Sequence, residues 1–150
     1  MKLAQPINNY CASSACLPNA SPLTSATCDT FDQCVILGWG YEDQTYGQVD
    51  QKLKQGFVKI YKDDVCDFLQ TNLFTAGPTR PTMSACQSSE QGQDACLGDQ
   101  GGPVLCYDGN RWAVQGIIPF NLCKDNEVSP YVVDVSYSDP WIYDTIRSNP

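Results

Sequence analysis

The chain has 150 residues, of which 42% are hydrophobic and 17% are charged, a composition typical of one folded globular domain and not of a disordered segment. It has no uninterrupted apolar run near the roughly 20 residues that a membrane-spanning helix needs, so we expect no membrane span. The net charge of −8 argues against nucleic acid and anionic membrane surfaces as partners, because both attract basic patches.

Strand patterns outnumber helix patterns along the chain. Short apolar runs with glycine, or alternating apolar and polar residues, predict strands at 34–40, 57–61, 114–118 and 131–135. A short helix is predicted over 62–69, and a final helix begins at Asp139, which can cap it, with Pro140 in its first turn. One face of this helix would carry its apolar residues, namely Trp141, Ile142, Thr145 and Ile146. Many short strands followed by a terminal helix predict an all-β barrel.

The chain contains nine cysteines and no histidine. Zinc sites need cysteines about two to four residues apart, usually with histidine, and the closest pairs here, Cys11 with Cys16 and Cys28 with Cys34, do not fit. We therefore expect no metal and no cofactor, but a disulfide framework formed in an oxidising compartment, and so a secreted, extracellular protein. Because nine is odd, one thiol is free or bonds outside the chain.

The segment 94–104 reads DACLGDQGGPV, which resembles the catalytic-loop signature of chymotrypsin-like and trypsin-like serine proteases. The match fails at Gln100, which stands where that signature has its nucleophilic serine. Other stretches follow in the family's order: ACLP at 15–18 resembles its inter-barrel linker, CVILGWG at 34–40 one of its strands, and RWAVQGII at 111–118 the strand leading into its substrate groove. The resemblance covers essentially the whole chain.

The family fold has two antiparallel six-stranded barrels with the active site between them. The resemblance implies an inter-barrel linker segment at 1–30, the second barrel at 31–138 and the C-terminal helix at 139–150. The first barrel, which carries the family's histidine and aspartate, would be missing from this chain.

The resemblance also assigns roles around Gln100. A carboxamide is not a nucleophile, so we expect no catalytic residue, and we expect Gln100 to fill the vacated site and hydrogen-bond locally. The N–H groups of Gly98 and Gln100 match the family's oxyanion hole. Asp99 matches the aspartate that pairs with a new N-terminal ammonium, although it could equally cap a turn. Asp94 matches the acid at the base of the trypsin pocket.

The pocket walls depart from the family pattern. Pro119, Phe120 and Asn121 stand where Ser-Trp-Gly is usual, and Pro130 replaces a wall glycine. Side chains at Asn121 and Pro130 would narrow or plug the pocket. Pro119 alters the strand beside the substrate backbone because proline cannot donate a hydrogen bond.

The resemblance implies a set of disulfides, to which we add the pairing of two cysteines that flank the linker: Cys34–Cys106, Cys66–Cys86, Cys96–Cys123 and Cys11–Cys28. It leaves Cys16 to bond a first-barrel segment of the same precursor or of another chain. Asn19 begins a weak glycosylation sequon, with Pro22 directly after it.

Three functions are compatible with these patterns. The leading hypothesis is a non-catalytic, secreted serine protease homologue that acts as a binding, regulatory or structural subunit. The alternatives are an active trypsin-like endopeptidase with an unusual nucleophile and a structural component of an extracellular assembly.

Overall fold

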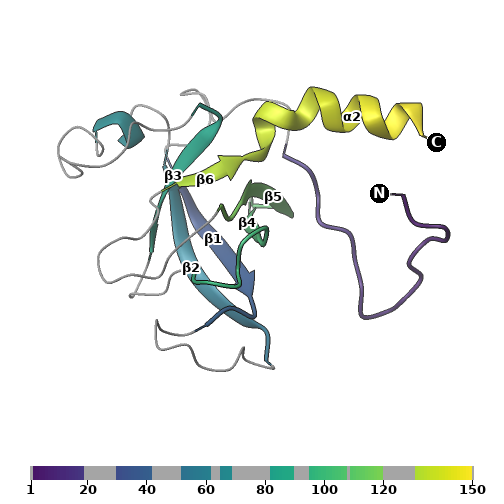
Figure 1. Cartoon of the computed structure of the whole chain (residues 1–150), viewed down its shortest axis with the longest axis horizontal. Coiled ribbons are helices and arrows are strands. Elements are labelled where there is room, and N and C mark those ends of the chain that lie inside the picture. The colour runs from purple at the N-terminus through teal and green to yellow at the C-terminus, as the bar shows by residue number, and fades with distance from the viewer. Residues whose placement is uncertain are drawn as a thin grey trace.

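A computed structural model of the chain describes residues 2–18, 30–41, 52–61, 65–68, 82–89, 95–107, 109–119 and 131–149. Its strands close into one antiparallel barrel in the order β1-β2-β3-β6-β5-β4, and a 3-10 turn and a helix follow the last strand (Figure 1). The expected all-β barrel with a C-terminal helix is therefore confirmed.

Four of the six strands overlap the ranges predicted from the sequence, whereas the strands at Ser84–Ser89 and Pro103–Tyr107 were not predicted. The strands are β1 (Thr30–Gly38), β2 (Lys54–Tyr61), β3 (Ser84–Ser89), β4 (Pro103–Tyr107), β5 (Trp112–Ile117) and β6 (Tyr131–Asp134). They are followed by η1 (Val135–Ser138) and α2 (Asp139–Ser148). Residues 65–68 are helical, inside the range 62–69 predicted for a short helix.

Alternation along the strands places the core inside the barrel. In β2 the side chains of Val58 and Ile60 are buried, whereas the side chain of Phe57, which points to the opposite face of the strand, is exposed. This alternation is expected for a strand with one face on the core. Cys34, Ile36 and Val104 meet them in one buried cluster. Register shifts in the β1–β2 and β4–β5 pairs, at residues 31–34 and 104–105, are irregularities of the kind that bend strands enough to close a small barrel.

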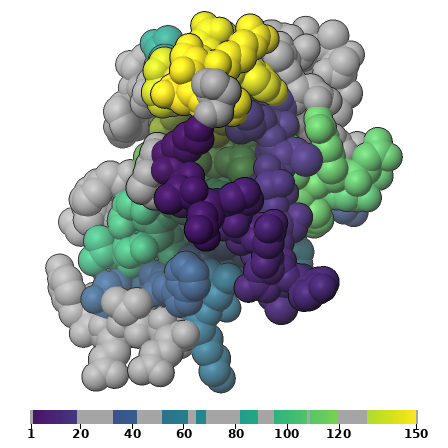
Figure 2. All heavy atoms as spheres, turned by 90° about the vertical axis from the view of Figure 1, so that its right-hand side faces the viewer, coloured from purple at the N-terminus to yellow at the C-terminus, as the bar shows by residue number. Residues whose placement is uncertain are grey.

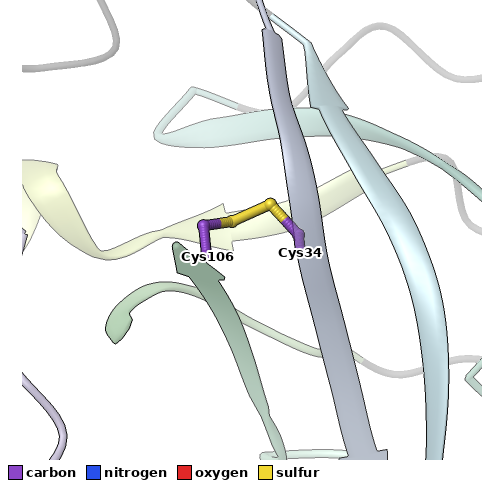
Figure 3. The surroundings of a disulfide bond; sticks show 2 residues. All are labelled: Cys34 and Cys106. Atoms are coloured by element: carbon purple, nitrogen blue, oxygen red, sulfur yellow. A yellow bond between two sulfur atoms is a disulfide. The ribbon is translucent and has the colours of Figure 1, made fainter. Parts of the chain in front are cut away.

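Two disulfides join cysteines that both lie among the described residues. Cys34 and Cys106 are directly paired residues of β1 and β4, and their sulfur atoms are bonded (Figure 3). Cys66, in the short helical turn, is bonded to Cys86 in β3. Both bridges have the partners that the family resemblance implies. Cys96 is also disulfide-bonded, and its expected partner Cys123 lies outside the described residues.

The expected Cys11–Cys28 bridge is wrong, because Cys11 is an exposed free thiol. Cys11 lies in a turn built by Asn9: the Cys11 N–H donates to Asn9 Oδ1 at 2.9 Å, and the Ala12 N–H donates to the Asn9 carbonyl at 3.1 Å. This turn lies on the exposed N-terminal segment, residues 2–15, and leaves the thiol in solvent. Cys28 lies outside the described residues.

The N-terminal segment is attached to the barrel at Cys16. The Cys16 N–H donates to the Trp112 carbonyl at 3.2 Å, and the Val114 N–H donates to the Cys16 carbonyl at 2.9 Å, which forms a parallel bridge to Ala113. Figure 2 shows this segment lying across one face of the molecule, with α2 on the same side.

The helix α2 starts one residue earlier than a cap at Asp139 would require. Asp139 is the first helical residue, Ser138 occupies the N-cap position, and Ser138 makes no side-chain cap bond. Asp134 instead caps the preceding turn η1, where its Oδ1 accepts from the Ser136 N–H at 2.9 Å. Along the predicted apolar face of α2, Trp141 is 71% exposed and Ile146 is 58% exposed, so these two side chains have little cover from the described residues.

The carboxyl group of Asp139 is buried without a hydrogen-bond partner among the described residues. The side chain is 3% exposed, and both carboxylate oxygens lack a donor. Burial raises the pKa of Asp139 above its usual value, because the charged form loses its hydration. The folded protein therefore holds this proton more tightly than the unfolded chain does.

The raised pKa of Asp139 predicts a pH-dependent loss of stability. Because the folded state binds more protons, the free energy of unfolding falls as the pH rises from about 3.8 through the raised pKa of the folded state. We expect Asp139→Asn to have little effect at pH 3.5 and to stabilise the fold by about 1 kcal/mol at pH 7, as measured by urea unfolding. Asp144→Asn, an exposed carboxylate of the same helix, is the matched control. An equal effect of Asp139→Asn at both pH values would contradict the prediction.

Candidate functional site

The site lies in the loop between Cys96 and Gly102, which leads into β4. The Tyr41 N–H donates to the Leu97 carbonyl at 3.0 Å, so the loop is joined to the segment that follows β1. On its other side, the Gly101 N–H donates to the Ile118 carbonyl, and the Ile118 N–H donates to the Gly102 carbonyl, both at 2.9 Å. The loop is thus held between the ends of two barrel strands.

Asp99 connects this loop to the end of β1. Its Oδ1 accepts from the Gly40 N–H at 2.7 Å, and its Oδ2 accepts from the Cys96 N–H at 2.9 Å. A Cβ atom at Gly38 or Gly40 would overlap the Asp99 carboxylate, which explains why a Gly-Trp-Gly sequence ends this strand. This is the turn-capping arrangement expected as one interpretation of Asp99. The other partner, an ammonium from another chain, stays a prediction.

Gln100 folds its side chain back onto its own loop. Gly98 has a φ of +101°, a conformation that strongly favours glycine, and its N–H donates to Gln100 Oε1 at 2.8 Å. The bond is exposed at the surface of the loop. Gln100 therefore makes a local hydrogen bond, and its partner is the backbone donor that the sequence pattern matched to an oxyanion hole.

Position 100 of this loop carries no side-chain nucleophile. A carboxamide has no acidic proton to lose near neutral pH and is not a nucleophile. The chain has no histidine that could act as a base. What the loop does offer is a backbone N–H at a glycine with positive φ, an arrangement that suits a carbonyl or carboxylate oxygen.

The structure places some of the other predicted residues. Pro119 follows β5 and is half-buried. The remaining pocket and modification residues, and so the predicted pocket closure and glycosylation, lie outside the described residues: Asp94, Phe120, Asn121, Pro130 and Asn19. In the part of the chain that the structure describes, no three His, Cys, Asp or Glu side chains gather into a metal site, and no helix is long and apolar enough to cross a membrane.

Sequence reasoning missed two features of the molecule. The first is the acceptor role of Gln100 toward Gly98, for which the signal is a long amide side chain two residues after a glycine. The second is the burial of the Asp139 carboxyl group, a residue that the sequence pattern treated as a helix cap.

Comparison with known proteins matches residues 1–142 to the family described as Trypsin. The chain is 28% identical over 138 residues to spermosin of Halocynthia roretzi, an alignment that covers 91% of this chain and 32% of that protein. It is 31% identical over 135 residues to inactive CLIP domain-containing serine protease A3 of Aedes aegypti, with 88% and 27% covered. It is 25% identical over 119 residues to human transmembrane protease serine 5, with 78% and 25% covered. The chain thus spans about a quarter to a third of the length of these relatives.

Proposed function

The chain belongs to the trypsin family, and from that premise we propose that it is a secreted, non-catalytic member that acts by binding another protein. The observation that carries this proposal is Gln100. It occupies the position that matches the family's nucleophile, and its carboxamide is bonded to the Gly98 N–H at 2.8 Å.

Peptide hydrolysis by the family's mechanism needs a nucleophile, a base and donors for the oxyanion. A first barrel on another chain would supply the histidine and the aspartate, but it would not replace the hydroxyl that Gln100 lacks. One of the similar proteins, that of Aedes aegypti, carries the word inactive in its name, which supports the proposal of a non-catalytic protein. The disulfides support secretion, because such bridges persist in oxidising compartments.

The partner that we propose is a first-barrel segment, from the same precursor or from another chain. The N-terminal segment and α2 lie on the same side of the molecule (Figure 2), and both carry exposed apolar side chains, namely Leu3, Ile7, Tyr10, Trp141 and Ile146. Soluble monomers rarely expose large contiguous apolar patches. In this proposal residues 1–30 are the linker, 31–138 the second barrel and 139–150 the helix, so the exposed side would receive the first barrel.

Cys16 is the proposed covalent link to that partner. Its thiol is free and half-buried, and it lies on the N-terminal segment where that segment joins β5. We expect native material to run as a heavier species on a non-reducing gel and to release a band near 16.5 kDa on reduction. Cys16→Ser should abolish the heavier species, whereas Cys11→Ser, which changes the exposed free thiol, should leave it. A soluble folded monomer with a free Cys16 thiol and the same low mass in both lanes would refute the link.

A further inference from the structure

We propose that Gln100 is a built-in occupant of the loop 97–101: its carboxamide holds the Gly98 N–H in the place that an acyl or carboxylate oxygen from outside would take. This inference rests on the proposed function, because it requires that Gln100 is not used in catalysis. It adds a regulatory contact to the same loop, since any ligand that needs the Gly98 donor must first displace the Gln100 side chain.

Three other backbone donors of the loop and its end are bonded to backbone carbonyls. The Asp99 N–H donates to the Cys96 carbonyl at 3.0 Å, the Gly101 N–H to the Ile118 carbonyl at 2.9 Å, and the Gly102 N–H to the Asp99 carbonyl at 2.9 Å. Breaking these bonds would require the backbone to move. The Gly98 N–H differs, because its acceptor is an exposed side-chain atom that leaves by rotation alone.

The carboxamide is a close chemical copy of a peptide carbonyl. Its oxygen accepts hydrogen bonds in the same way as a peptide oxygen, and 2.8 Å is a full-strength N–H to oxygen distance. Gln100 is only two residues from Gly98 along the chain, so its side chain binds the Gly98 N–H as an intramolecular ligand at high effective concentration. This gives it an advantage over a similar ligand in solution. Removing the Gln100 oxygen would leave the Gly98 N–H exposed and open to a small carboxylate.

Selective labelling with ¹⁵N-glycine tests this assignment in the protein as it is isolated. The chain has 11 glycines, so the spectrum is simple, and Gly101 and Gly102 act as internal controls because their N–H groups donate to backbone carbonyls. Gln100→Met keeps the side-chain length without an acceptor, and we expect it to speed hydrogen exchange at Gly98 by about tenfold. Gln100→Glu keeps an acceptor oxygen and should preserve the protection. Gly101 and Gly102 should exchange at unchanged rates in both variants.

A second measurement asks whether the donor becomes available to ligands. In Gln100→Ala, titration with sodium acetate should shift the Gly98 amide signal, whereas the same titration should leave Gly98 of the unmodified protein unchanged. Equal exchange of Gly98 in the unmodified protein and in Gln100→Met, or an equal response to acetate with and without Gln100, would overturn the inference. Peptidase activity in the unmodified protein would instead overturn the proposed function, so the two failures are distinguishable.

Discussion

Hydrolysis of arginyl, lysyl or aromatic peptide substrates should be undetectable, even when a first barrel with its histidine and aspartate is restored to the protein. The reason is that Gln100 provides no nucleophile. Loss of the nucleophile alone lowers the turnover of a serine protease by about a millionfold. The measurement is a chromogenic amidase assay on the reconstituted protein, together with labelling by a fluorophosphonate probe, which reacts only with an activated nucleophile. Robust turnover or labelling of the unmodified protein would support the alternative of an endopeptidase with an unusual nucleophile.

The reversion Gln100→Ser is the matched test, because it restores the hydroxyl and removes the side chain that bonds Gly98. We expect it to recover little activity. The sequence predicts that the side chains of Asn121 and Pro130 would obstruct the substrate pocket, and Pro119 has no N–H to donate to the substrate backbone. Gln100→Ala serves as the control, since it opens the loop without adding a nucleophile. Full recovery of activity in Gln100→Ser alone would show that the pocket is open.

Removing the Cys34–Cys106 disulfide should cause the largest loss of stability of any change described here. The two cysteines are separated by 72 residues, so the bond strongly restricts the unfolded chain, and a loop of that length corresponds to about 4 kcal/mol in the chain-entropy treatment. Both side chains are buried in the barrel core, next to Ile36 and Val104. We therefore expect the double variant Cys34→Ala/Cys106→Ala to lower the free energy of unfolding by about that amount.

Urea unfolding of the isolated protein measures this loss. Cys11→Ser is the control for the change of a cysteine, because the Cys11 thiol is free and exposed, and it should leave the midpoint of unfolding unchanged. A double variant that stayed within about 1 kcal/mol of the unmodified protein would contradict the prediction.

The fold was largely predictable because its signals are local. The alternation of residues around Val58 and Ile60 predicts which side chains of that strand point into the core. The glycines around Asp99 belong to a motif whose spacing is fixed by backbone geometry, since Gly38 and Gly40 must approach the Asp99 carboxylate closely. A sequence motif can therefore predict both the strand end and the loop that it contacts.

Features that depend on tertiary packing were harder to predict. The strand expected at 131–135 ends at Asp134, because that side chain accepts from the Ser136 N–H and starts a 3-10 turn. This turn leads directly into α2, whose first residue, Asp139, is buried instead of capping the helix. In the same way, a list of cysteines contains no information about where the N-terminal segment runs, so the pairing assigned to Cys11 was wrong.

The bridge at Cys16 has a mechanical consequence. Its backbone N–H is bonded to the Trp112 carbonyl and its carbonyl to the Val114 N–H, so the residue is joined to β5 by two hydrogen bonds. A partner joined to the Cys16 sulfur would be fastened to β5, and tension on that partner would pass into the barrel through these two hydrogen bonds. The exposed residues 2–15 would lie outside the path of the force, so they would not slacken the connection.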